Sequence, residues 1–327
     1  MPPPAASEER ETEGLSWLGT RANLIIDENG EPVLLRGVNV AGLDSAALEP
    51  RQTLGDALAL NESALAILTG LWGVNVVRLP FLAGTLLDGT ESLPADALLG
   101  ELDQLIADVA GAGTYVLLAL QAPGSDGASA LPDEATLECW QSLAARYQDE
   151  PGVLYEIYAA SSPLPQGWPD AANRLIGTVR REHPAALIFL SGAAAGADVN
   201  GLPVRFATGE PVHDLVYTVR FAPQMAQASH DPRFRSFTQN FPVVASQWSD
   251  SGPDLGRTAD LAVQLFERYG IGWIAASWNV EPRLVKNAAA RNYAATRFGN
   301  AVRRALTLPV RLPLIPSPGA DRRWPSV

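Results

Sequence analysis

The chain has 327 residues, which suits one α/β barrel with inserted loops, and its 47% hydrophobic content is ample for a large core. Its formal net charge of −12 argues against nucleic-acid and anionic membrane partners, whose phosphates an acidic surface repels. The single cysteine, Cys139, excludes an internal disulfide, and three histidines without close spacing argue against a zinc site, so we expect neither metal nor cofactor.

The N-terminal residues 1–14 are polar and acidic, with no basic start and no apolar stretch. This composition predicts a disordered acidic tail and not a signal peptide. No run of the chain approaches the 18 or so apolar residues of a membrane span. We therefore predict a cytoplasmic protein, unless a leader has been removed.

The first predicted element is a β-hairpin over residues 23–36. Two short apolar runs flank Asn29-Gly30, a pair that favours the left-handed backbone of a tight turn.

After the hairpin, eight short apolar runs alternate with longer segments of helical spacing. Most of the runs are nearly continuous in apolar residues, which is typical of parallel strands covered by helices. They comprise residues 34–39, 74–80, 115–121, 153–159, 186–192, 215–221, 243–248 and 272–278. The predicted helices between and after them include residues 62–71, 95–112, 132–147, 169–181, 258–269 and 287–305.

Eight strand–helix repeats predict the α/β class and a single (β/α)₈ TIM barrel over residues 15–307. A doubly wound open sheet is the alternative architecture. Residues 308–327 carry five prolines and no helical period, so we predict an extended proline-rich C-terminal tail.

Several segments, in the right order and spacing, resemble glycoside hydrolase family 5, the cellulase-like retaining β-glycosidases. Residues 33–39 resemble the opening strand of that family. Residues 71–80 resemble its second strand, which ends in a site arginine, here Arg78. Residues 102–121 and 140–155 resemble the helix–strand pairs that lead to the third and fourth strand ends. The resemblance runs from about residue 20 to about residue 306.

The resemblance implies an active site at the C-terminal ends of the strands, with two carboxyl groups about 5 Å apart. One protonates the glycosidic oxygen, and the other attacks the anomeric carbon. In this chain, Ala159-Ala160 stands where the family has its amide and acid on strand four. Gln247 stands at the position of the nucleophile. Neither Ala160 nor Gln247 can ionise, so the resemblance implies that both catalytic groups are replaced.

Other strand ends depart from the family pattern as well. Gln121 occupies the histidine position on strand three, and Arg220 opens the segment that matches His-x-Tyr on strand six. Ala276 occupies the position of a tryptophan on strand eight. Guanidinium and amide groups can bind hydroxyls or a carboxylate, and indole faces can stack on sugars. The predicted ligand contacts are Arg78, Gln121, Arg220, Gln247, Trp248 and Trp278.

The sequence therefore predicts a catalytically inactive, glycoside-hydrolase-like pseudoenzyme that binds an oligosaccharide or another small polar ligand, or serves as a scaffold. The positive charge of Arg220 favours an acidic sugar such as a uronate. The alternative is an active β-glucan or β-mannan hydrolase whose carboxylates have moved, with Asp250 and Glu281 as candidates. Glu156 lies four residues before Ala160, about 13 Å deeper in a strand. We expect it to be a packing residue paired with Arg36 or Arg78.

Overall fold

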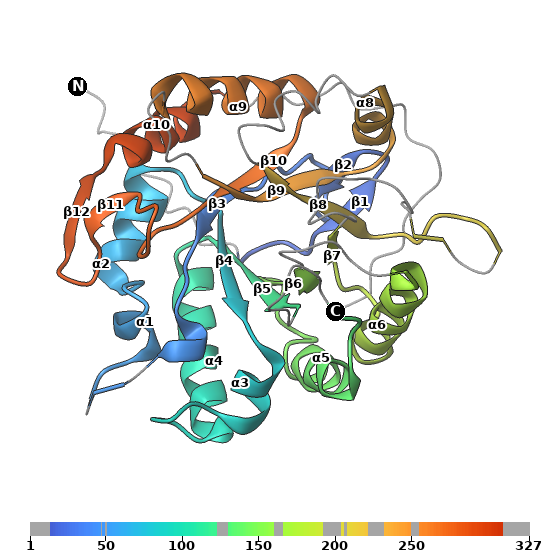
Figure 1. The fold of residues 1–327 in the computed structure, drawn as a ribbon, viewed down its shortest axis with the longest axis horizontal. Helices are drawn as coiled ribbons and strands as arrows, with labels where there is room; N and C mark the ends of the chain where they lie inside the picture. The colour runs from blue at the N-terminus through green and yellow to red at the C-terminus, as the bar shows by residue number, and fades with distance from the viewer. Residues whose placement is uncertain are drawn as a thin grey trace, which may run out of the picture.

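The computed structural model describes residues 14–46, 48–49, 51–122, 130–159, 166–191, 204–205, 208–221, 232–249 and 255–309. Within them, eight parallel strands form a closed barrel in the order β10-β3-β4-β5-β6-β7-β8-β9 (Figure 1). Closure confirms the predicted (β/α)₈ barrel and excludes the doubly wound open sheet. No helix in the described part of the chain is both long and apolar enough to span a membrane.

The barrel strands lie close to the predicted runs. Their bounds are β3 Arg36–Asn39, β4 Val76–Phe81, β5 Tyr115–Gln121, β6 Val153–Ala159, β7 Ile188–Ser191, β8 Leu215–Phe221, β9 Val243–Trp248 and β10 Gly272–Ala275. The predicted bounds of β5, β6, β8 and β9 are confirmed to the residue. All eight strands run in one direction, so their C-terminal ends meet at one rim.

Helices surround the barrel (Figure 1). The longer ones are α4 Ala95–Gly111, α5 Glu134–Arg146, α6 Trp168–Glu182, α8 Pro232–Asn240, α9 Leu255–Tyr269 and α10 Arg297–Leu306. Shorter turns are η1 Leu43–Ser45, α1 Leu54–Ala57, α2 Glu62–Leu65 and α3 Ala83–Asp88. The predicted helix 62–71 is α2 followed by a π-helical segment, η2 Ala66–Leu71.

Two predictions need correction, one of a hairpin and one of a helix. The N-terminal hairpin is formed by β1 Gly19–Arg21 and β2 Leu24–Ile26, one turn earlier than predicted. The predicted turn at Asn29-Gly30 exists, with Gly30 at φ +82°, but only an isolated bridge follows it. The predicted helix 287–305 is in fact a second hairpin, β11 Val285–Asn287 with β12 Asn292–Ala295, followed by α10.

The start of α10 has a local cause. The Thr296 hydroxyl accepts a hydrogen bond from the backbone N–H of Gly299 at 3.0 Å and so caps the helix. The same hydroxyl donates to the carbonyl oxygen of Arg283 at 2.6 Å. These bonds fix the boundary between the β11–β12 hairpin and α10 at Thr296. The helix-like spacing of apolar residues before Thr296 therefore does not produce a helix.

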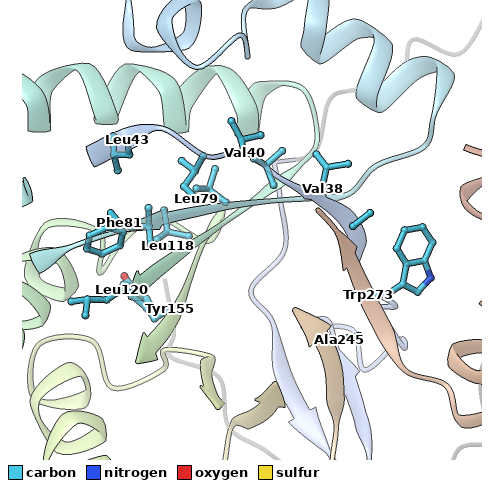
Figure 2. Packing of buried hydrophobic residues seen from close by; sticks show 14 of the residues in the cluster. Val38, Val40, Leu43, Leu79, Phe81, Leu118, Leu120, Tyr155, Ala245 and Trp273 are labelled. Atoms are coloured by element: carbon cyan, nitrogen blue, oxygen red, sulfur yellow. The ribbon is translucent and has the colours of Figure 1, made fainter. Parts of the chain in front are cut away.

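Strand side chains alternate between an outer and an inner apolar layer. The outer layer packs between the strands and the helices, and Figure 2 shows Leu79 and Phe81 of β4 beside Leu118 and Leu120 of β5. The inner layer fills the lower barrel with Val76, Leu117, Leu154, Phe189, Val216, Val244 and Ile274, and Leu18 and Ile25 of the N-terminal segment join it. The interior is therefore filled and closed from below, which leaves the C-terminal rim for a site.

Candidate functional site

A cavity of about 260 Å³ lies at the C-terminal ends of the barrel strands. Every barrel strand or the residues just after it contributes to the lining. Its residues are Asn39, Ala41, Arg78, Pro80, Gln121, Glu156, Ala159, Ser191, Arg220, Ser246, Gln247, Ser249, Ala276, Ser277, Val280, Glu281 and Pro282. The barrel interior thus changes from apolar below to polar at the mouth, where a hydrophilic ligand can be bound.

A buried ion pair forms part of the cavity wall. Arg78 Nε donates to Glu156 Oε2 at 2.5 Å, and the two side chains are 6% and 1% exposed. Arg78 Nη1 donates to Asn39 Oδ1 at 2.8 Å, and Asn39 Nδ2 donates to the carbonyl oxygen of Ser246 at 3.1 Å. The expected pairing of Glu156 with Arg78 is confirmed. Arg36 instead donates to the carbonyl oxygens of Ala305 and Leu308 on the outside of the barrel.

Three half-buried polar side chains stand above this ion pair. Gln121 ends β5, Arg220 lies near the end of β8, and Gln247 lies near the end of β9. Arg220 and Gln247 are partners in the register of adjacent strands. Within the described part of the chain, the side chains of all three line the cavity without a hydrogen bond to the protein. Their donors and acceptors are therefore available to a ligand.

The charge of Arg220 is poorly solvated. Burial lowers the pKa of its guanidinium, the nearby positive charge of Arg78 lowers it further, and the carboxylate of Glu156 acts in the opposite direction. An arginine remains protonated under these conditions. The cavity therefore holds a cation that has lost part of its water without gaining a protein partner among the described residues.

Trp248 does not lie on the cavity, which corrects the prediction that it contacts a ligand. It is 2% exposed and packs edge-on against Trp273 at 5.6 Å and Phe298 at 5.3 Å between ring centroids. Successive residues of a strand point to opposite faces. Because Gln247 faces the cavity, its neighbour Trp248 faces the helices.

The prediction for Trp278 needs the same correction. Its side chain is fully buried, and its Nε1 donates to the carbonyl oxygen of Ala59 at 2.8 Å. Its ring stacks on Tyr293 of β12 with 5.7 Å between centroids. The ring is part of the packing between the β10 end and the β11–β12 hairpin, so neither of its faces is open to a sugar.

The carboxylates differ in their surroundings. Ala160 and Asp250 lie outside the described residues. Glu281 lines the cavity, but its side chain is 77% exposed and pairs with Arg283 Nε at 3.1 Å. In the described part of the lining, Glu156 and Glu281 are the only carboxylates: one is held in the buried ion pair and the other lies at the rim.

Some of the cavity polar groups escaped the sequence predictions. Asn39 ends β3 and is the register partner of Arg78, and Ser191 ends β7, where its hydroxyl lies 3.1 Å from that of Thr218. Asn39 is the last residue of the predicted run 34–39, and Ser191 is the last but one of the predicted run 186–192. Listing each strand-end polar residue, and not only those with a family counterpart, would have identified them.

The chain is similar in sequence to proteins of one known family. The sequence profile of the cellulase family, glycosyl hydrolase family 5, matches residues 26–282. Endoglucanase E-5 from Thermobifida fusca is 25% identical over 270 residues, which cover 78% of this chain and 53% of that protein. The major extracellular endoglucanase from Xanthomonas campestris pv. campestris is 30% identical over 193 residues, 51% of this chain and 39% of that protein. The chain thus matches about half or less of the length of these relatives.

Solved structures share the fold. A β-glucanase from Saccharophagus degradans in complex with cellotetraose has a TM-score of 0.69 at 19% identity, with 94% of this chain and 97% of that chain covered. The catalytic domain of endoglucanase Cel5A from Thermobifida fusca, also with cellotetraose, has a TM-score of 0.69 at 18% identity, with coverage of 89% and 97%. At these levels of sequence identity, the similarity shows a shared fold only.

Proposed function

The chain belongs to the cellulase family, glycosyl hydrolase family 5, and we propose that it binds an oligosaccharide at the barrel mouth without hydrolysing it. The observation that carries the proposal is Gln247, whose amide lines the cavity near the end of β9, where the family resemblance places the nucleophile. A carboxamide cannot form the covalent glycosyl intermediate of a retaining glycosidase. Ala160, at the position of the acid, cannot protonate a leaving group.

Binding is supported by the polar groups that remain. Gln121, Arg220 and Gln247 offer amide and guanidinium donors, together with amide oxygens, to sugar hydroxyls. The two structural neighbours named above are complexes with cellotetraose, which supports an oligosaccharide as the class of ligand. With both tryptophans inside the core, ring stacking from Trp248 and Trp278 is not part of the proposal.

The second candidate function is hydrolysis with relocated carboxylates. One observation favours it, namely that Glu281 lines the cavity. Its partner would be Asp250 or the cavity-wall residue Glu156. Retaining or inverting chemistry needs two carboxyl groups between about 5 and 9.5 Å apart across the bond that is cleaved. Glu281 is exposed and its carboxylate pairs with Arg283, so its position depends on a rim contact.

One NMR experiment tests both candidates. The purified chain is mixed with cellotetraose, saturation transfer reports binding, and the reducing-end anomeric signals report cleavage. We expect saturation transfer to the sugar and no new anomeric signals over a day. New anomeric signals that disappear in Asp250→Asn or Glu281→Gln would establish the relocated hydrolase and contradict our proposal. Absence of both binding and cleavage with cellotetraose and with an acidic oligosaccharide would contradict it as well, and would favour a scaffold.

A further inference from the structure

The two arginines of the cavity differ in how their charge is balanced. Arg78 is neutralised by Glu156, with which it forms the buried ion pair, and Asn39 occupies a further donor. Arg220 lines the same cavity but makes no ion pair or hydrogen bond within the described part of the chain. At the rim, the charge of Glu281 is paired with Arg283. The described lining therefore carries one uncompensated positive charge, that of Arg220.

This charge sits where a carboxylate can reach it. Arg220 is half-buried, and desolvation is the main reason that the pKa of its guanidinium falls. A desolvated cation gains more from an anionic ligand than an exposed one does, because less water must be displaced and the local screening is weaker. Its register partner Gln247 adds an amide N–H at the next strand end. A guanidinium fork beside an amide donor suits the planar oxygens of a carboxylate.

We propose that Arg220 and Gln247 bind the carboxylate of a uronic acid, so that the ligand of this cavity is a short uronate-bearing oligosaccharide. The inference rests on the proposed carbohydrate-binding function and names its ligand class. One unpaired guanidinium matches the single charge of a carboxylate better than the double charge of a phosphate. The volume of about 260 Å³ lies just below the range of about 300–1,000 Å³ typical of small-molecule sites, which favours a short ligand.

The net charge of the chain restricts the ligand further. A formal charge of −12 repels a polyuronate at long range. At physiological ionic strength this repulsion decays over a Debye length of about 8 Å, whereas a contact inside the cavity is screened much less. A single uronate therefore experiences the local charge of Arg220, while the further charges of a long polyuronate lie over an acidic surface.

Calorimetric titration of three matched disaccharides at pH 7 tests the proposal. The probes are cellobiose, the same disaccharide with its non-reducing glucose oxidised to glucuronate, and the methyl ester of that glucuronate. Because a hydrogen bond to a charged group is stronger than one between neutral groups, we expect the acid to bind about tenfold or more tightly than cellobiose. The methyl ester should bind like cellobiose because it lacks the negative charge of the acid. The ester comparison needs no protein variant.

A protein variant then assigns the effect to one residue. In Arg220→Gln, the ratio of the affinity for the acid to the affinity for cellobiose should fall from about ten to about one, whatever the change in the affinity for cellobiose itself. Arg303→Gln, which removes an exposed arginine of α10 on the outside of the barrel, should change neither affinity. Unfolding curves for each variant check that the fold is retained.

The outcomes separate this inference from the function on which it rests. If cellobiose binds and the acid binds no better, or if the preference for the acid persists in Arg220→Gln, the inference is overturned and the proposed function stands. If none of the three disaccharides binds at millimolar concentration, and cellotetraose and other longer cellooligosaccharides do not bind either, both the inference and the proposed function are overturned. A preference for the acid that disappears with the methyl ester and in Arg220→Gln supports both.

Discussion

Arg78 and Arg220 show how the surroundings of a residue, and not its type, decide its role. Both line the cavity, but Arg78 is held by Glu156 at 2.5 Å and by Asn39 at 2.8 Å, while Arg220 has no such partner among the described residues. A buried pair contributes little net stability over an apolar one, but removal of one member leaves an uncompensated charge. Arg78 is therefore part of the framework, and Arg220 is free to take part in binding.

At the residue scale, Glu156→Gln should destabilise the protein strongly. The change preserves the shape of the side chain but leaves the charge of Arg78 buried without a counter-ion, so we expect the free energy of unfolding to fall by about 3 kcal/mol. Urea unfolding followed by circular dichroism measures the change. Glu134→Gln is the matched control. The side chains of Glu134 and its partner Arg174 are 89% and 63% exposed, so their ion pair should contribute less than about 0.5 kcal/mol. Equal effects of the two substitutions would refute the structural role of Glu156.

At the scale of elements, two irregular strands shape the cavity. The register shifts between β5 and β6 and between β8 and β9, where β6 and β9 each carry one additional residue near the C-terminal end. As a result, Glu156 and Ala159 line the cavity three positions apart, and the consecutive residues Ser246 and Gln247 both line it. Bulges of this kind re-aim side chains at the rim of a barrel.

Two glycines, one in β3 and one in α4, test opposite effects of an added methyl group. A Cβ atom at Gly37 of β3 would lie 1.8 Å from the carbonyl oxygen of Val76, its register partner in β4. We expect Gly37→Ala to force the strands apart and to cost at least about 3 kcal/mol of unfolding free energy. Gly100 lies exposed within α4, and a Cβ atom added there would meet no atom within 4 Å apart from its own helix backbone, so Gly100→Ala should stabilise the protein by about 0.5–1 kcal/mol. Thermal and urea unfolding of both variants will show whether the changes in unfolding free energy have opposite signs.

At the scale of the whole molecule, the N-terminal segment joins distant parts of the barrel. Trp17 packs edge-on against His183 at 5.4 Å between centroids, and His183 Nδ1 lies 3.1 Å from the hydroxyl of Tyr155 in β6. The hydroxyl of Tyr115 donates to the carbonyl oxygen of Ser16 at 2.8 Å. Since Leu18 and Ile25 belong to the inner apolar layer, this segment closes the lower end of the barrel and stabilises the fold around the cavity.

His183 should make the stability of the molecule depend on pH. Burial lowers its pKa from 6.5 to about 4, while the negative charge of Asp149 acts in the opposite direction. Between these two values the unfolded chain binds a proton that the folded chain does not, so stability falls as the pH falls through 6.5 towards 4. From pH 7.5 to 5.5 the loss should be about 1.4 kcal/mol.

Urea unfolding at several pH values above the isoelectric point near 4.7 measures this dependence. His183→Gln should remove most of the slope, and His213→Gln, which replaces an exposed histidine, should retain it. An unchanged slope in His183→Gln would show that His183 is not the source.

The sequence alone determined the barrel and much of the rim of the cavity. Eight apolar runs separated by helical spacing define a closed parallel sheet, because parallel strands need a covering helix after each strand. Because the C-terminal ends of the strands meet at one rim, the sequence also predicted the cavity residues Arg78, Gln121, Arg220 and Gln247.

Only the tertiary structure decided which way each remaining side chain faces and which turn signals become hairpins. Side chains alternate with a period of two, so Trp248, next to the cavity residue Gln247, enters the core. The β1–β2 and β11–β12 hairpins make contacts with residues distant in the sequence: the backbone N–H of Thr20 donates to Asp214 Oδ1 at 2.9 Å, and Tyr293 stacks on Trp278. Local propensity does not encode such contacts, and their packing energy outweighs it.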